Sequence, residues 1–333
     1  MRNNTKLLYA AMQVAMAESY GAPGGIVTEN FAVEIPMETK LNSSITQSSE
    51  FLQRITVEGV TDMKGQALRL GITGIMAGRT TGTRAAKMLG SPTGTTWEAV
   101  QTNFDVGIDY NTMDSWARLG NLMDKYAPVI YNAIALDRIT VGIYGTSVAT
   151  TTDPVTNPLG QDVNLGWAHL LKTQKPANYM LQGTNLANQI QIGETGDYKN
   201  IDAMAKDLLN QIPVEHRTGK EVVIVGSALV AADSNKVLST HGQTPSEKPD
   251  IKMMSESYGG LPAMQIPKFP DMGMWVTDPK NLHLYYQEDK TRRSSKDESA
   301  LSMVVDYISS NDAYAIGNLE AFMAVEAANV VFV

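Results

Sequence analysis

The amino-terminal part of the chain carries apolar residues at helical spacing. These residues are Leu7, Leu8, Ala11, Met12, Ala15 and Met16. Because Tyr9, Gln13 and Glu18 interrupt the apolar stretch, an amphipathic helix is favoured over a secretory signal peptide, which would share the basic start and the small residues. Glycines and a proline at residues 21–25 then predict a flexible break.

Residues 28–97 show no continuous apolar face. The polar stretch 28–54 predicts an extended arm followed by a helix around residues 45–55. Glycines then recur at positions 59, 65, 71, 74, 78, 82, 90 and 94. Short alternating pieces between them predict a long two-stranded hairpin with a loose tip over residues 56–97. A compact domain has little use for so long an excursion, so we expect it to pack on something outside the chain.

Regular alternation returns at residues 101–110, which predict a strand. Its apolar face would carry Phe104, Val106 and Ile108, and its solvent face Asp105 and Asp109. A helical stretch follows near residues 114–119. Pro128 suits the first turn of a second, long helix over residues 129–144, because the missing N–H of proline is not needed there.

The loop 146–158 is rich in Ser, Thr, Asp and Pro and is a candidate domain boundary. An α/β region follows it. Helices are expected at residues 166–172, 201–209 and 227–238, and strands at residues 221–226, 274–277, 282–287 and 321–326.

The composition is that of a globular protein of about two domains, since the chain has 333 residues and a domain averages roughly 150. No apolar run is long enough to predict a membrane span. The chain contains no cysteine, which excludes disulfides, thiolate nucleophiles and cysteine-based metal sites. A net charge of −8 argues against phosphate binding over a broad basic surface.

Two glycine-containing segments resemble nucleotide-binding motifs only superficially. Residues 71–82 lack the Lys-Ser or Lys-Thr that a phosphate-binding loop needs after its last glycine, so a hairpin tip is favoured. Residues 223–227 could begin a dinucleotide fold, but the G-x-G-x-x-G spacing is missing. A plain strand-to-helix turn is therefore expected there.

The titratable residues form no catalytic pattern along the sequence. The histidines are His169, His216, His241 and His283, and no two of them have helical i, i+4 spacing. The acidic segment 193–197 could bind a cation, although a polar turn is the favoured interpretation. Arg292 and Arg293 alternate with acidic neighbours, which favours a salt-bridged contact surface over a nucleic-acid site. We therefore expect no enzyme and no cofactor.

A series of short strings resembles landmarks of the major capsid proteins of Peduovirus-type tailed phages, in family order. They are SSEFLQRI (48–55), MKG (63–65), GITG (71–74), NFD (103–105), YNTMDSWAR (110–118), NP (157–158), QDV (161–163), GW (166–167), GDY (196–198), DA (202–203), VVIVG (222–226), LPA (261–263), IP (266–267), FP (269–270), NL (281–282) and RR (292–293). Each string is weak alone. Their order along almost the whole chain makes the resemblance specific.

The resemblance implies the α+β, Hong Kong 97-type capsid fold. Residues 1–55 would form the N-terminal arm and residues 56–99 an extended β-hairpin loop over a neighbouring subunit. Residues 100–145 and 286–333 would form a peripheral domain with a spine helix, and residues 146–285 an axial α/β domain. The family also commonly loses an N-terminal segment to a maturation protease, which would cut at or just after residues 21–25.

The function implied is that of a major capsid protein, made in the host bacterial cytoplasm, which assembles as hexamers and pentamers into an icosahedral shell around double-stranded DNA without sequence-specific binding. The partners implied are further copies of the chain, a scaffold or maturation protease, a portal and decoration proteins. The residues expected at assembly contacts are Met63, Lys64, Gly65, Gly71, Gly74, Arg79, Arg84, Pro128, Arg292 and Arg293.

Two alternatives remain open from the sequence alone. One is an encapsulin-like nanocompartment shell on the same fold. The other is a soluble α/β enzyme or ligand-binding protein built on residues 146–290, which would be a monomer or dimer with a converging polar pocket.

Overall fold

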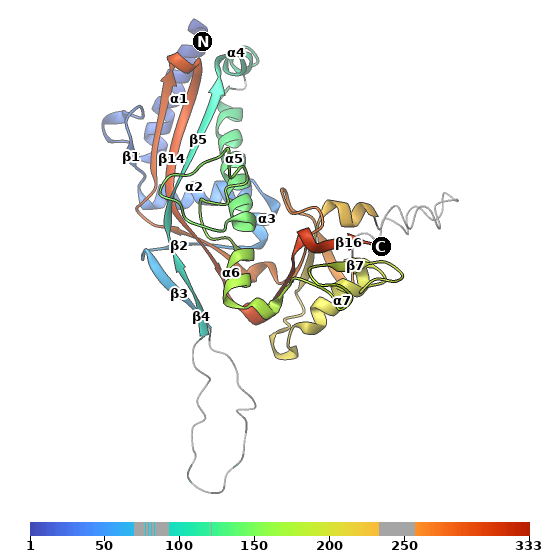
Figure 1. The fold of residues 1–333 in the computed structure, drawn as a ribbon. Coiled ribbons are helices and arrows are strands. Elements are labelled where there is room, and N and C mark those ends of the chain that lie inside the picture. The colour runs from blue at the N-terminus through green and yellow to red at the C-terminus, as the bar shows by residue number, and fades with distance from the viewer. Residues whose placement is uncertain are drawn as a thin grey trace, which may run out of the picture.

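The computed structural model describes residues 1–69, 77, 79, 81, 83, 93–120, 122–232 and 257–333. Within these residues two six-stranded sheets organise the chain, with a long helix beside the first and a separate hairpin below it (Figure 1). The two termini lie at opposite ends of the molecule, the N-terminus beside the first sheet and the C-terminus beside the second (Figure 1).

The first sheet has the strand order β1-β13-β14-β12-β2, and β5 pairs with β14. Its strands are β1 (Phe31–Ala32), β2 (Thr56–Val60), β5 (Val100–Asp109), β12 (Leu282–Gln287), β13 (Arg292–Glu298) and β14 (Met303–Ile316). The alternation predicted for β5 is confirmed, since Phe104 and Ile108 are buried and Asp105 and Asp109 are exposed. Strand β14 runs antiparallel to β5, β12 and β13, so it is the central strand of this sheet.

Five helices accompany the first sheet in the described part of the chain. They are α1 (Asn3–Tyr20), α2 (Ile35–Gln47), α3 (Glu50–Arg54), α4 (Tyr110–Arg118) and α5 (Leu122–Tyr144). The extended arm expected before residue 45 is wrong, because α2 occupies that stretch. Its buried face consists of Glu38, Leu41, Asn42 and Ile45. Half of these residues are polar, so the helical spacing is hidden from an apolar pattern.

The second sheet has the order β6-β15-β11-β8-β10-β9. Its strands are β6 (Tyr179–Met180), β8 (Val222–Val225), β9 (Ser257–Tyr258), β10 (Leu261–Met264), β11 (Met274–Thr277) and β15 (Phe322–Val325). Helix α7 (Ile201–Gln211) packs on this sheet, and α6 (Trp167–Gln174) contacts α5 and β14. The strands predicted at residues 221–226 and 274–277 are confirmed. The helix predicted at residues 227–238 is helical from 227 to 232 and then leaves the described residues.

The division expected between the peripheral and axial parts needs two corrections. The strand predicted at residues 321–326 exists as β15, but it pairs with β11 and β6 of the second sheet instead of completing the first. A boundary at residue 285 would also cut β12, which pairs with β14 and β2 of the first sheet along its whole length. Burial on both faces explains β15, since all its residues are buried.

The remaining elements are short. Two further pairs of strands are β3 (Lys64–Arg69) with β4 (Thr93–Glu98), and β7 (Ile190–Ile192) with β16 (Val330–Phe332). The single-turn helices are η1 (Pro23–Gly25), η2 (Pro176–Asn178), η3 (Val214–His216), η4 (Pro279–Asn281), η5 (Ser299–Leu301), η6 (Leu319–Ala321) and η7 (Ala327–Asn329).

Trp167 lies where the two sheets meet. Its ring packs edge-on against Phe51 at 6.1 Å and Tyr314 at 5.2 Å between ring centroids. Its indole N–H donates to the carbonyl of His283 at 3.0 Å, so the polar edge of the buried ring is satisfied. One apolar cluster continues from this residue into both sheets. The two halves therefore share a core instead of being joined by a linker.

Candidate assembly surfaces

The base of the β3–β4 hairpin lies outside both sheets (Figure 1). Antiparallel pairing places Lys64 opposite Glu98 and Gly65 opposite Trp97. The Lys64 ammonium and the Glu98 carboxylate form an exposed ion pair at 2.8 Å. A hairpin was predicted over residues 56–97, and its paired base is confirmed at β3 and β4. The first part of that stretch, β2, instead belongs to the first sheet.

Trp97 anchors this hairpin to the first sheet. Its ring lies 5.1 Å from that of Tyr285, and the hydroxyl of Thr95 donates to the carbonyl of Ile316 at 2.8 Å. On its other side the Trp97 ring covers Gly65, where a Cβ atom would lie 2.4 Å from a ring carbon. Glycine is therefore required at residue 65 for the tryptophan to lie flat across the strand pair.

The expected contact residues of this loop are only partly brought together. Met63, Lys64 and Gly65 lie side by side at the hairpin base, and Met63 is half exposed. Arg79 is exposed, but the structure describes neither of its two neighbours in the chain. Gly71, Gly74 and Arg84 lie outside the described residues. The assembly role of all seven stays a prediction.

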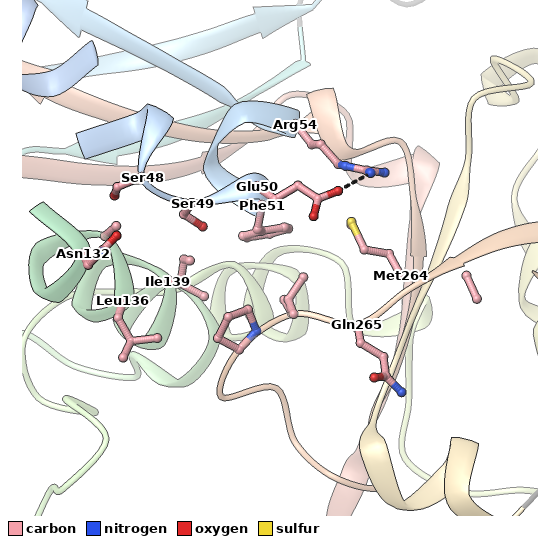
Figure 2. Close-up of a pocket in the computed structure, with 14 residues that line it drawn as sticks. Ser48, Ser49, Glu50, Phe51, Arg54, Asn132, Leu136, Ile139, Met264 and Gln265 are labelled. Atoms are coloured by element: carbon pink, nitrogen blue, oxygen red, sulfur yellow. Dashed lines mark hydrogen bonds and ion pairs between the residues drawn. The ribbon is translucent and has the colours of Figure 1, made fainter. Parts of the chain in front are cut away.

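A groove of about 660 Å³ runs between α3, α5 and the segment after β10 (Figure 2). Its floor is apolar and includes Phe51, Leu136 and Ile139. On the rim, the Arg54 guanidinium donates to the Glu50 carboxylate at 2.5 Å, and both side chains are exposed. The hydroxyl of Ser48 donates to the carbonyl of Ile45, and no histidine lines the groove, so its lining residues offer no activated nucleophile.

The position expected for Pro128 is wrong. Helix α5 begins at Leu122, so Pro128 lies inside it instead of in its first turn. Upstream of the proline, Leu122 and Tyr126 are buried on the same face as Ile130. Burial of that face outweighs the cost of about 3 kcal/mol that proline carries in a helix interior. Pro128 itself is exposed and cannot donate to the carbonyl of Asp124.

Arg292 and Arg293 do not form one contact surface. Arg292 is half-buried, and its guanidinium donates to the backbone carbonyls of Asp289 and Thr291. Arg293 is 1% exposed and forms an ion pair with Asp306, with 2.6 Å between Nη2 and Oδ2. Contrary to the expectation, Arg293 therefore does not lie on the surface of the protomer. Strand alternation points its side chain into the protein, beneath α1.

A second buried ion pair joins Arg138 of α5 to Asp312 of β14, with 2.8 Å between Nε and Oδ2. The same guanidinium donates to Asn42 of α2 at 2.9 Å and stacks over Phe104 of β5, 5.7 Å from the ring centroid. This site was missed from the sequence. Its only signal is a charged pair, Asp137 and Arg138, in the largely apolar second half of α5.

The other polar residues singled out from the sequence have structural roles. His283 accepts or donates a hydrogen bond with the Tyr285 hydroxyl at 2.9 Å, and His216 lies 3.2 Å from the Asn318 amide. Asp197 accepts backbone N–H groups of residues 184, 185 and 191, which confirms the polar turn at residues 193–197. His241 lies outside the described residues.

The described ranges contain no cluster of three or more potential metal-ligating side chains. In the same ranges, no helix combines the length and hydropathy that crossing a bilayer would require. What the geometry does offer is a protomer with a projecting hairpin and a groove at the junction of its two sheets. These are features of a surface that contacts other macromolecules.

Comparison with known proteins defines the class. A family model described as "Phage major capsid protein, P2 family" matches residues 8–328. The capsid protein of Escherichia phage P2 is 33% identical over 339 residues, covering 98% of this chain and 95% of that protein. The major capsid protein of Serratia phage KSP20 is 28% identical over 333 residues, covering 95% and 94%.

Solved structures agree with the sequence comparison. The satellite phage P4 procapsid, which includes the size determination (Sid) protein, matches with a TM-score of 0.78 at 30% identity, covering 100% of this chain and 99% of that one. The capsid of an empty GTA particle matches with a TM-score of 0.52 at 15% identity over 84% and 89%. The second likeness concerns the fold alone.

The sheet topology, the long helix α5 beside the first sheet and the projecting hairpin define a tailed-phage shell subunit of the Hong Kong 97 type. The chain belongs to the P2 family of phage major capsid proteins. It is thus a structural component of the virion that self-assembles into the icosahedral shell of a P2-like phage. The nanocompartment alternative is not favoured.

Proposed function

We propose that the protomer assembles as hexamers and pentamers, with the β3–β4 hairpin lying over a neighbouring subunit. The observation that supports this arrangement is the placement of the hairpin outside both sheets, fixed to the first sheet through Trp97 and Tyr285. A two-stranded hairpin is marginally stable by itself and gains stability when it packs against another surface. Ring closure lets each such contact be individually modest.

In this proposal the first sheet and α5 form the peripheral part of each subunit, and the second sheet forms the axial part near capsomer centres. The shell encloses double-stranded DNA without reading its sequence, which fits the net charge of −8. The protomer has no enzymatic role, and it is made in the host cytoplasm, where a cysteine-free chain needs no oxidation. A scaffold or maturation protease, a portal and decoration proteins complete its partners.

Negative-stain microscopy and size-exclusion chromatography of the purified full chain test the assembly. Rings, shells or curved sheets are expected, and a stable monomer under all conditions, including co-expression with the other head proteins, would contradict the proposal. The hairpin contact is tested by Met63→Glu, which places a charge on an exposed apolar side chain at the hairpin base.

The matched control for the hairpin is Val155→Glu, a similar change at a strongly exposed residue of the loop after α5. We expect Met63→Glu to reduce particle yield while the melting temperature of the unassembled protein stays unchanged. Equal particle yields from the two variants would contradict a neighbour contact at the hairpin base.

A further inference from the structure

Strand β13 is composed entirely of polar residues, yet its middle is buried. It reads Arg-Arg-Ser-Ser-Lys-Asp-Glu, and Ser295 is completely covered. Protein interiors normally select apolar side chains at such positions, because burying a polar group costs free energy unless the protein supplies a hydrogen-bond partner. A permanently covered strand would be expected to carry Val or Ile. A strand that is exposed to water in another state of the protein would be expected to carry polar residues.

Helix α1 covers the middle of β13 together with Tyr126 of α5. The Tyr9 hydroxyl lies 2.9 Å from the Ser295 hydroxyl, and the Gln13 amide donates to the Ser295 carbonyl at 3.3 Å. The Tyr20 ring lies 4.6 Å from the Arg293 guanidinium carbon. Each of these contacts is made by a group on β13 that water could satisfy equally well.

The surface beneath α1 is complete without it. Arg293 keeps its ion pair with Asp306, and the Ser295 hydroxyl keeps a second partner, the Tyr126 hydroxyl of α5, at 3.2 Å. One nitrogen of Arg293, Nη1, is buried without any hydrogen-bond partner while α1 is in place. Hydration of that nitrogen would offset part of the cost of removing the helix.

The chain can release α1 without disturbing the segment after residue 25. Gly21, Gly24 and Gly25 all have left-handed backbone angles, with φ of 71°, 65° and 72°, and no residue of η1 is buried. Immediately afterwards the carbonyl of Val27 accepts the Ser295 N–H at 2.8 Å, and β1 pairs with β13. The glycines therefore form a hinge between a helix held by side chains and a segment held by backbone hydrogen bonds.

Helix α1 also buries a smaller share of its apolar residues on docking than a helix with a single apolar face would. Its docked face buries Tyr9, Met12, Met16 and Ala17. The opposite face carries Leu7, 72% exposed, and Val14, 58% exposed. Apolar burial of the docked face is thus opposed by desolvation of a polar strand, which reduces the net free energy gained when α1 docks.

We propose that α1 is a reversible lid over a polar surface formed by Arg293, Ser295 and Asp306, and that it opens at the glycine hinge while the rest of the protomer stays folded. Opening hydrates β13 and frees both faces of α1. This device is independent of how the hairpin contacts its neighbour, so it can be tested on the unassembled protomer.

The test is thiol labelling of Ser295→Cys in the full chain, which has no cysteine of its own. The matched control is Ser310→Cys, a similarly buried serine on β14 that is covered by Arg138 of α5 instead of by α1. If α1 opens as a lid, the thiol at 295 reacts on the order of tenfold faster or more than the thiol at 310, well below the denaturant concentration that unfolds the protein.

Equal labelling rates that both follow global unfolding would overturn the proposal. Hydrogen exchange of the unaltered protein gives a second readout if the Ser295→Cys variant fails to fold. Amides in the middle of α1 are then expected to exchange faster than those in the middle of α5, and equal protection of the two helices would reject the lid.

Discussion

Arg138 and Asp312 are separated by 174 residues in the chain, yet they form a two-pronged ion pair in which each side chain is 2% exposed. The guanidinium donates through Nε at 2.8 Å and through Nη2 at 3.1 Å. Since Asn42 accepts from the third nitrogen, one side chain joins α2, α5 and β14. This pair fixes how α5 lies on the first sheet.

Replacing Arg138 by Leu leaves the Asp312 carboxylate buried without a counter-ion. We expect the free energy of unfolding to fall by about 3–5 kcal/mol, measured by urea denaturation of the unassembled protein. The control is Lys172→Ala, which breaks an exposed pair with Glu326 and should cost about 1 kcal/mol or less. Similar losses in the two variants would show that the buried pair is not special.

Gly142 of α5 lies directly against the Trp167 ring, where a Cβ atom would approach a ring carbon to 2.4 Å. Alanine is the better helix former by about 1 kcal/mol, but both the helix and the ring are buried and cannot move freely. We expect Gly142→Ala to lower the free energy of unfolding by about 1–3 kcal/mol and to alter the near-ultraviolet circular dichroism of Trp167. Increased stability would contradict this close packing.

Apolar alternation made β5 predictable and a continuous apolar run made β8 predictable, because burial of one or both faces selects side chains within a few consecutive residues. Strand β13 and helix α2 show no such apolar pattern. The partner of Ser295 is Tyr9, 286 residues away, and Glu38 is buried because it accepts backbone N–H groups of residues 289 and 291. Polar burial of this kind depends on tertiary partners that no local pattern contains.

The candidate contact residues also divide into those with a local signal in the sequence and those without one. Gly65 could be predicted, since a glycine inside a strand indicates a close approach, here by Trp97. Pro128 was placed wrongly, because a preference for the first helical turn was outweighed by burial of Leu122 and Tyr126 further upstream. Arg138 was missed because a charged residue inside an apolar helix gives no indication of its partner.

The interior position of Pro128 gives it a different role from fixing the start of the helix. In Pro128→Ala the new N–H can donate to the Asp124 carbonyl, so we expect a gain of up to about 3 kcal/mol in the free energy of unfolding. A straighter, stiffer α5 should then slow any rearrangement of assembled shells, measured by microscopy of particles over time. Unaltered stability and unaltered shell maturation would count against a role for this proline.

Lowering the pH should weaken the docking of the first turn of α1, because it protonates the Asp114 carboxylate. The pKa of this carboxyl lies below its usual value because it accepts hydrogen bonds from the backbone N–H of Arg2 and from Thr5. A lowered folded-state pKa stabilises docking above about pH 4, and this contribution is lost as pH falls through the folded value. We expect Asp114→Asn to speed hydrogen exchange in the first turns of α1 at pH 7, and to do so less at pH 3.

Asp105 is the matched control for this pH effect. Partial desolvation raises the pKa of this exposed carboxyl, so its charge does not favour folding and Asp105→Asn should not speed exchange in α1. An effect of Asp114→Asn that is equally large at both pH values would contradict a role for the charge.

Gly65→Ala should disrupt the hairpin base, because the added methyl group occupies the place of the Trp97 ring. We expect faster hydrogen exchange in β3 and β4 and a lower yield of particles, while the second sheet stays protected. Gly65→Ala combined with Trp97→Leu removes the clash and should restore pairing in part. Full protection of β3 in the single variant would show that the ring can shift away.

The place of β15 has a consequence for how each subunit is made. This strand, Phe322–Val325, lies between β6 and β11, and it follows both of them in the sequence. The second sheet therefore cannot close before residues 322–325 have been synthesised. A product that stops earlier lacks an inner strand instead of a dispensable tail. We expect such products to leave the second sheet incomplete and so to stay out of a growing lattice.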